Sequence, residues 1–149
     1  MKYSNEMKLR IKSLSENEGF CRACVANFCS SVLPTIEELC DLKTVVSEAV
    51  TNSVVHAYPG TIGDIEIIVK ISDNTIYITI ADFGVGISDI EKAKQPFYTT
   101  MNNGERSGMG FSVMETFMDS VVVKSKLGKG VIITMTKNIG SNARAVGGQ

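Results

Sequence analysis

The chain has little that would point to nucleic acid, a membrane or secretion. Its 149 residues carry a formal net charge of only −1, so no general electrostatic attraction to nucleic acid or an anionic membrane is expected. No apolar run approaches the roughly 20 residues of a membrane span, and the first residues, MKYSNEMKLR, lack the apolar core of a signal peptide. We therefore expect a cytoplasmic protein that contacts neither nucleic acid nor membrane directly.

The chain has four cysteines, and their spacing does not match that of a metal site. Cys21 and Cys24 form a C-x-x-C pair, but no second pair and no His at zinc-ligand spacing follows them. The two remaining cysteines, Cys29 and Cys40, stand alone. This pattern favours small apolar side chains on a cytosolic helix over a metal or redox role.

Three common signatures of nucleotide-binding proteins and kinases are also missing. The chain has no G-x-x-x-x-G-K-[ST] sequence, and no G-x-G-x-x-G opens a strand–helix unit. It lacks the V-A-I-K and H-R-D elements of eukaryotic-type protein kinases. These absences exclude a P-loop protein, a dinucleotide-binding fold and a eukaryotic-type kinase.

The residues that are present predict one compact domain. Hydrophobic residues make up 44% and charged residues 21% of the chain, which is close to the globular average. Apolar periodicity predicts strands at 5–14, 64–72 and 75–82, two more within 121–138, and helices at 15–33, 36–57, 88–95 and 111–120. This order predicts an α/β (α+β) two-layer sandwich over residues 1–139, with a mixed, mostly antiparallel sheet covered by helices on one face. Residues 140–149 have the composition of a disordered C-terminal tail.

The predicted helix at 36–57 carries an unusual pair of polar residues. Glu48 and Asn52 are four residues apart and therefore share one helix face, which also carries Val45 and Val55. A helix that is apolar all round is normally buried, and burying a carboxylate without a partner is costly. Two interpretations remain open at this point: a solvated face with incidental valines, or a pair that lines an internal cleft.

Two glycine-bearing segments favour the cleft. In ADFGVGI, Asp82 ends an apolar strand and is followed by Gly84 and Gly86. In ERSGMGF, Gly108 and Gly110 come directly before a helix. Glycines at that place allow backbone N–H groups to approach an anion, and the helix dipole favours phosphate. Ordinary turns and helix caps would also account for these glycines.

The motifs E-x-x-x-N, D-x-G-x-G and G-x-G, in this order, resemble those of the Bergerat or GHKL ATP-binding fold. The segments TVVSEAVTNSVVHAY, DFGVGI, QPFYTT and ERSGMGF are more specifically similar to the anti-sigma F factors, a family of small bacterial serine kinases that control sporulation. The resemblance covers nearly the whole chain, to about Ile139. It implies a homodimeric ATP-binding protein that uses Mg²⁺.

The resemblance also implies roles for single residues. Asn52 is expected to hold the Mg²⁺ that bridges the ATP phosphates, and Glu48 to act as the general base towards a serine hydroxyl. Asp82 is expected to accept a hydrogen bond from the adenine amino group, while Gly84 and Gly86 leave room for the ring.

Further residues are expected to support the base or to cover the phosphates. Thr134, on a late strand, would support the hydrogen bond at adenine. Arg106 would neutralise charge on the γ-phosphate. The other expected lid residues are Thr99, Thr100, Ser107, Gly108 and Gly110. The chain has Met101 where the family pattern has a lysine, so the chemistry of the lid at this position departs from that pattern.

The resemblance implies two protein partners. These are a sigma factor, sigma F, kept from RNA polymerase core, and an anti-anti-sigma factor phosphorylated on serine. Arg22 is expected to dock these partners, with a solvated surface arginine as the alternative. His56 extends the face of Glu48 and Asn52, and its sequence context favours a structural role over that of a proton shuttle or phosphoacceptor.

Three rival functions remain compatible with parts of the sequence. An anti-sigma B-type stress-response kinase would share the same catalytic motifs. A non-catalytic, ATP-dependent sigma-binding module would not need Glu48. A detached ATP domain of a histidine kinase would normally accompany a dimerisation helix with a phosphoacceptor His, which this sequence lacks.

Overall fold

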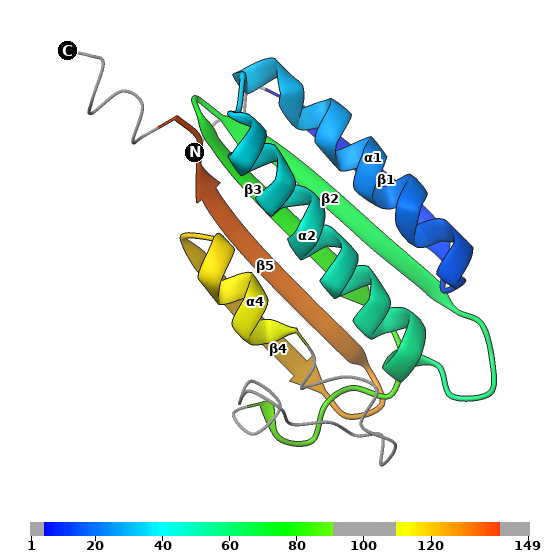
Figure 1. The fold of residues 1–149 in the computed structure, drawn as a ribbon. Coiled ribbons are helices and arrows are strands. Elements are labelled where there is room, and N and C mark those ends of the chain that lie inside the picture. The colour runs from blue at the N-terminus through cyan, green and yellow to red at the C-terminus, as the bar shows by residue number, and fades with distance from the viewer. Residues whose placement is uncertain (1–4, 91–109, 141–149) are drawn as a thin grey trace.

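A computed structural model of the chain describes residues 5–90 and 110–140. Within these residues, an antiparallel sheet of five strands forms one layer and three α-helices cover one of its faces (Figure 1). The strand order is β1-β2-β3-β5-β4. The strands are β1 (Asn5–Lys12), β2 (Asp64–Ser72), β3 (Thr75–Asp82), β4 (Ser120–Lys126) and β5 (Gly130–Asn138). The helices are α1 (Glu18–Cys29), α2 (Ile36–Asn52) and α4 (Phe111–Phe117). The expected two-layer sandwich is thus confirmed, with every strand pair antiparallel.

Strict alternation of apolar and polar residues builds the central strands. In β2 and β3 every second side chain is buried, and Ile67 lies opposite Ile80 in the register. The turn between these strands contains Asp73 at φ 54°, a left-handed conformation that aspartate tolerates better than most residues. The buried rows of both strands face the helices and form the centre of the core.

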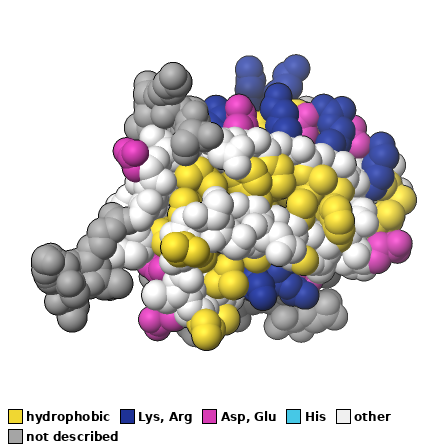
Figure 2. All heavy atoms as spheres, turned by 90° about the horizontal axis from the view of Figure 1, so that it is seen from above, with side chains coloured by type: hydrophobic (Ala, Val, Ile, Leu, Met, Phe, Trp, Pro, Cys, Tyr) yellow, Lys and Arg dark blue, Asp and Glu magenta, His cyan; other side chains and the backbone are white. Residues whose placement is uncertain are grey.

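The outer strand β1 has one apolar and one charged face. Met7, Leu9 and Ile11 pack against the core, as their alternation predicts. On the other face Arg10 forms an ion pair with Glu66, and Lys12 contacts Asp64 at 2.8 Å. Figure 2 shows Lys and Arg side chains gathered along one side of the molecule. Because these pairs are exposed, they contribute little stability.

The buried face of α1 differs from the expected one. Phe20, Cys24 and Phe28 recur at the spacing of an apolar helix face, but Phe20 is 57% exposed. The fully buried row lies one residue further on, at Cys21, Val25 and Cys29. These smaller side chains allow α1 to lie close to α2, while Phe28 remains half-buried at the edge of the core.

The long helix α2 is fixed at both ends. At its start Thr35 and Glu38 form a capping box, and Glu38 Oε2 also accepts a hydrogen bond from Gly140 N at 2.8 Å. At its end the helix widens into a π-helical turn, Ser53–Ala57. The predicted helix at 36–57 is therefore confirmed in extent. Its first residue, Ile36, has the helical spacing of the buried Val46 and Val50 but is 84% exposed.

Some expectations concern residues that lie outside the described ranges. The predicted helix at 88–95 falls there for the most part, as does nearly all of the predicted tail at 140–149. Within residues 5–90 and 110–140, none of the helices combines the length and the apolar composition needed to cross a bilayer.

Candidate functional site

The site is built around the buried carboxylate of Asp82 at the end of β3. Its side chain is almost fully buried, at 5% exposure. Oδ1 accepts hydrogen bonds from Gly84 N at 3.1 Å and from Val131 N at 3.2 Å, and Oδ2 accepts one from Ser53 Oγ at 2.9 Å. Hydrogen bonds of this kind satisfy a buried carboxylate and fix its orientation. Asp82 is thus a fixed acceptor supported by three separate segments.

The loop after Asp82 packs against the end of α2 and against β4. A β-carbon at Gly84 would overlap the carbonyl of Ala57, which accepts a hydrogen bond from Val85 N at 2.9 Å. Gly86 has φ 81°, and a β-carbon there would lie 2.6 Å from Lys126 O. Both glycines are therefore required for close backbone packing of the loop, a constraint that the D-x-G-x-G pattern alone did not specify.

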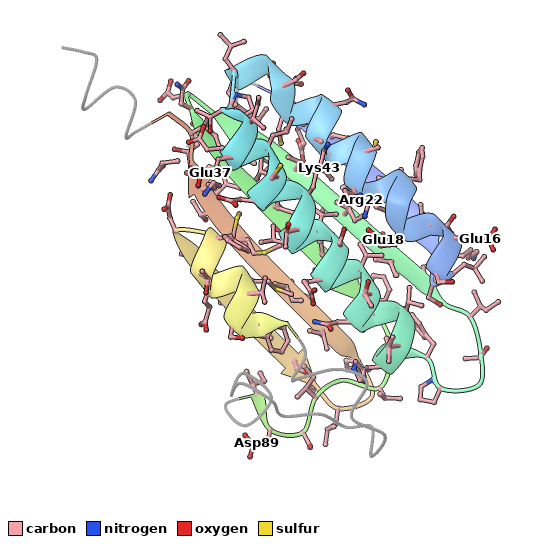
Figure 3. All side chains as sticks on the ribbon, viewed as in Figure 1. Glu16, Glu18, Arg22, Glu37, Lys43 and Asp89 are labelled. Atoms are coloured by element: carbon pink, nitrogen blue, oxygen red, sulfur yellow. The ribbon has the colours of Figure 1, made fainter. Side chains whose placement is uncertain are left out.

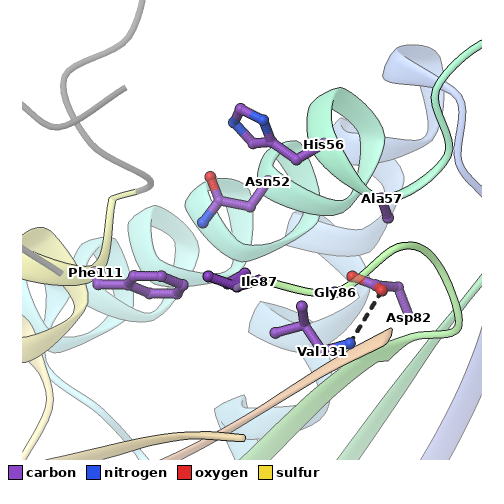
Figure 4. Close-up of a pocket in the computed structure, with 8 residues that line it drawn as sticks. All are labelled: Asn52, His56, Ala57, Asp82, Gly86, Ile87, Phe111 and Val131. Atoms are coloured by element: carbon purple, nitrogen blue, oxygen red, sulfur yellow. Dashed lines mark hydrogen bonds between the residues drawn. The ribbon is translucent and has the colours of Figure 1, made fainter. Parts of the chain in front are cut away.

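A pocket opens beside this carboxylate (Figure 4). Asn52 and His56 line it from α2 and the π-helical turn, and Asp82 lines it from β3. The remaining lining residues are Ala57, Gly86, Ile87, Phe111 and Val131. The cavity that these side chains leave free is small, about 20 Å³. Apolar walls with a few convergent polar groups are the usual composition of small-ligand sites.

Glu48 lies one helical turn before Asn52 and contacts the N-terminus of α4. Gly110 has φ 74°, and a β-carbon there would overlap the Glu48 carboxylate. The next residue, Phe111, is buried in the core and also lines the pocket. Glu48 is partly exposed, whereas Asn52 is 5% exposed. The structure thus brings Glu48, Asn52, Asp82, Gly84, Gly86 and Gly110 to one end of the molecule.

Thr134 does not belong to this group, which corrects the sequence-based assignment. The β3–β5 register pairs Thr134 with Thr79, while the residue whose N–H reaches Asp82 is Val131. Side chains alternate along a strand, so Thr134 faces the side of the sheet opposite to Val131 and Ile133. Thr134 is three residues from Val131, an odd number, so its side chain lies on the other face of the sheet and outside the pocket.

Arg22 lies away from the pocket, on the outer surface of the two long helices (Figure 3). Its Nη1 is 2.9 Å from Glu18 Oε2 and 3.3 Å from Ser47 Oγ, and Ser47 in turn donates to Glu18. The Arg22 side chain is 44% exposed. It borders a groove between α1 and α2 that also includes Ala26, Leu39 and Lys43.

The other predicted lid residues lie outside the described ranges. They are Thr99, Thr100, Arg106, Ser107 and Gly108, and Met101 lies outside these ranges as well.

Sequence analysis did not identify three residues that support Asp82 or the loop after it. Ser53 directly follows Asn52, and its hydroxyl was a visible candidate partner for the aspartate. Tyr58 accepts a hydrogen bond from Phe83 N at 2.8 Å, although nothing in its sequence context indicates this contact. Val131 contacts Asp82 only through its backbone N–H, so its residue type could not indicate the contact.

The cysteines are free thiols in mixed surroundings. Burial raises the pKa of Cys21 to about 11 and that of Cys29 to about 12. Cys24 is half-buried, and its Sγ lies 3.8 Å from Met7 Sδ. Cys40 is exposed.

Comparison with known proteins identifies the family. A family model described as a histidine kinase-like ATPase domain matches residues 12–137. The anti-sigma F factor of Caldanaerobacter subterraneus subsp. tengcongensis is 54% identical over 142 residues, which are 95% of this chain and 99% of the relative. The chain belongs to the anti-sigma F factor family. The anti-sigma F factor of Bacillus velezensis is 48% identical over 136 residues, covering 91% of this chain and 93% of the relative. The resemblance inferred from the motifs is therefore confirmed.

Solved structures with distant sequences share the fold. The RsbU and RsbW domains of a Mycobacterium tuberculosis protein match with a TM-score of 0.67 at 14% identity, covering 91% of this chain and 33% of that one. The catalytic domain of the histidine kinase ThkA matches with a TM-score of 0.57 at 15% identity, covering 91% of this chain and 97% of that one. At these identities the likeness establishes the fold alone. The family model of a histidine kinase-like ATPase domain agrees with this fold.

Proposed function

We propose that this protein is an ATP-dependent serine kinase that also sequesters a sigma factor. In this proposal a single domain over residues 1–139 binds sigma F and keeps it from RNA polymerase core. It phosphorylates a serine of an anti-anti-sigma factor, which prevents that factor from releasing sigma. The family membership and the names of the relatives support the sigma-binding role. The protein would act in the cytoplasm as a homodimer.

One observation carries the nucleotide-binding part of this proposal: Asp82 and Asn52 line the same pocket. A carboxylate fixed by Ser53, Gly84 and Val131 is a suitable acceptor for an exocyclic amino group such as that of adenine. It would reject a base that presents a carbonyl oxygen at the same position. The apolar Ile87 and Val131 would contact the faces of the ring.

The residues at the other end of the site suit a magnesium–phosphate complex. Asn52 offers an amide oxygen, a ligand type that Mg²⁺ accepts together with phosphate oxygens and water. When bound, Mg²⁺ and ATP would supply the γ-phosphoryl group and the neutralising charge for its transfer.

Glu48 is the residue best placed to act as the general base. It is one helical turn from Asn52, so their β-carbons are about 6 Å apart. Its carboxylate lies against Gly110, directly before the N-terminus of α4. There it would take the proton from the attacking serine hydroxyl.

The lid and docking residues complete the proposal. Arg106 would neutralise charge on the γ-phosphate, while Thr99, Thr100, Ser107 and Gly108 would cover the phosphates. Met101 cannot supply the positive charge that the family pattern places there. Arg22 is proposed to dock the protein partners, because its 44% exposure leaves the guanidinium accessible at the groove between α1 and α2.

The test is a phosphorylation assay with radiolabelled ATP, Mg²⁺ and the anti-anti-sigma factor, followed by identification of the modified residue. We expect label on one serine that survives acid treatment. Acid-labile label would indicate phosphohistidine and support a histidine kinase domain instead. ATP binding without any transfer would indicate a sigma-binding module that is not a kinase.

A second assay identifies the sigma partner. Purified sigma F and sigma B are each offered to the ATP-loaded protein in a pull-down. Retention of sigma F alone supports the proposal, whereas retention of sigma B alone would indicate the stress-response kinase.

A further inference from the structure

We propose that Tyr58 is a positioning residue whose hydroxyl holds the base-binding loop and thereby sets the affinity and selectivity of the pocket for adenine. The inference rests on the proposed function, because it concerns the same nucleotide site. It assigns a role to a residue that does not line the pocket and that the motifs did not single out.

The hydroxyl of Tyr58 joins two backbone segments. It donates a hydrogen bond to Asp64 O at 2.6 Å, at the start of β2, and accepts one from Phe83 N at 2.8 Å. Phe83 directly follows Asp82, and its side chain is 52% exposed. The Phe83 side chain therefore adds little packing of its own, and its backbone is held by Tyr58 and by close contact with Gly130.

The ring of Tyr58 is itself fixed in place. A β-carbon at Gly63 would overlap the ring, so the ring lies directly on the backbone of Gly63. Burial raises the pKa of the Tyr58 phenol, and it therefore stays protonated at physiological pH. A protonated hydroxyl in a fixed ring can donate to Asp64 O and accept from Phe83 N at the same time.

Tyr58 completes a set of contacts that come from one short segment, 53–58. Ser53 Oγ donates to Asp82 Oδ2, Tyr58 accepts from Phe83 N, and the Ala57 carbonyl accepts from Val85 N. Three residues of the loop are thus attached to the end of the helix that carries Asn52. This arrangement fixes the position of the Asp82 carboxylate relative to Asn52.

Selectivity follows from this fixed position. Adenine presents an amino group to Asp82, whereas guanine presents a carbonyl oxygen that a carboxylate repels. A pocket discriminates strongly only if its polar group cannot move away from the wrong partner. Release of Phe83 would let Asp82 shift, which weakens the grip on ATP and leaves GTP binding nearly unchanged.

The decisive variant is Tyr58→Phe, which keeps the ring on Gly63 and removes only the hydroxyl. Tyr77→Phe is the matched control, because Tyr77 lies on β3 in the half-exposed row that alternates with the buried one. Binding of Mg-ATP is measured by calorimetry and that of Mg-GTP by competition, with thermal unfolding in parallel. Loss of one positioning hydrogen bond is expected to weaken ATP binding about three- to tenfold.

Three further results are expected if Tyr58 acts by positioning. GTP binding stays within about twofold, so the preference for ATP falls by the same factor as ATP affinity. The kcat at saturating ATP stays within about twofold while KM rises. Tyr77→Phe matches the unmodified protein. An unchanged ATP-to-GTP ratio in folded Tyr58→Phe would overturn the inference, even if the variant melts earlier.

A measurement on the unmodified chain covers the case in which Tyr58→Phe does not fold. The amide of Phe83 is expected to exchange its hydrogen at least about tenfold more slowly than an unstructured amide, despite the exposed side chain. Exchange at the unstructured rate would refute the contact with Tyr58. Absence of ATP binding by the unmodified protein would instead refute the proposed function and is thus distinguishable.

Discussion

The carboxylate of Glu48 lies directly against the backbone of Gly110, although the two residues are more than sixty positions apart in the sequence. The contact joins the middle of α2 to the first residue before α4. Gly110 meets two requirements here: it has φ 74°, and it has no β-carbon to collide with the carboxylate. The proposed general base therefore lies where only a glycine at position 110 leaves room for its carboxylate.

Gly110→Ala is expected to abolish phosphorylation, because the added methyl group would displace Glu48 and strain the backbone. Gly128→Ala is a matched control, since Gly128 has φ 79° but no atom within 4 Å of its would-be β-carbon. Both variants should lose about 1–2 kcal/mol of stability from the left-handed conformation. Only Gly110→Ala should lose activity, by at least about 100-fold. Equal activity of the two variants at 15 °C would contradict the proposed position of Glu48.

Glu48→Gln is expected to bind ATP within about threefold of the unmodified protein and to lose phosphorylation by about 100- to 10,000-fold. The amide keeps the shape of the side chain but cannot accept the serine proton. Glu37→Gln, at an exposed position in the first turn of α2, is the control and should leave both quantities unchanged. Calorimetry and the radiolabel assay measure the two effects. Unreduced phosphorylation would mean that Glu48 is not the base.

Asp82→Asn is expected to weaken ATP binding by about tenfold or more, because the pocket would lose its charged acceptor. The amide also cannot accept the bonds from Ser53, Gly84 and Val131 at both of its terminal atoms. Asp73→Asn is the control, since that residue has φ 54° in an exposed turn and asparagine tolerates this conformation. Unchanged ATP affinity in the Asp82→Asn variant would mean that the adenine base binds elsewhere.

Thr35→Ala is expected to lower the free energy of unfolding by about 1 kcal/mol, because the Thr35 hydroxyl accepts a hydrogen bond from Glu38 N at 3.0 Å. ATP binding should stay unchanged, because the cap lies at the far end of α2 from Asn52. Urea denaturation measures the stability. Thr44→Ala provides a control on the same helix, since the Thr44 hydroxyl donates only to Cys40 O within the helix. A similar loss for both variants would argue against the capping contribution.

The stability of the protein is expected to fall as pH rises above 9. Burial raises the pKa of Cys29 from an ordinary 9.0 to about 12 and that of Cys21 to about 11. Above pH 9 these thiols ionise in the unfolded chain but stay protonated in the folded chain. Their contribution to folding stability is therefore complete below pH 9 and is lost as pH rises through the pKa values of the folded state. In urea denaturation, the free energy of unfolding of the Cys29→Ala variant should decrease less between pH 8 and pH 10.5 than that of the unmodified protein.

Thiol labelling tests the same burial independently. In the folded protein at pH 8, Cys40 should react first because it is exposed, while Cys21 and Cys29 should react only after denaturation. Mass spectrometry of the labelled peptides distinguishes the sites. Prompt labelling of Cys29 in the folded protein would show that its thiol is not buried.

The sequence predicted the elements well because their periodicity is strong. The alternation around Ile67 and Ile80 and the apolar stripe of α2 specify which faces are buried. The burial of α1 could not be assigned in the same way. Two adjacent rows, one with Phe20 and one with Cys21, are both compatible with helical spacing, and only the approach of α2 selects the row of smaller residues.

Site residues on α2 and at the end of β3 were recognisable because a motif places each of them in a fixed local position. Thr134 was misassigned for a different reason. Its relation to Asp82 depends on the register between β3 and β5, which separate stretches of sequence do not specify. Tyr58 was missed because its contact with Phe83 arises only from the way the chain returns after the π-helical turn.

The π-helical turn at Ser53–Ala57 has a consequence for protein engineering. Removing one residue from it to restore a regular α-helix would rotate the following chain by about 100° about the helix axis. The hydroxyl that holds Phe83 would then point elsewhere, while Glu48 and Asn52 stayed in place. Chimeras between relatives should therefore exchange the whole stretch from Glu48 to Gly86 as one cassette, since a junction inside it would separate the two halves of the cleft.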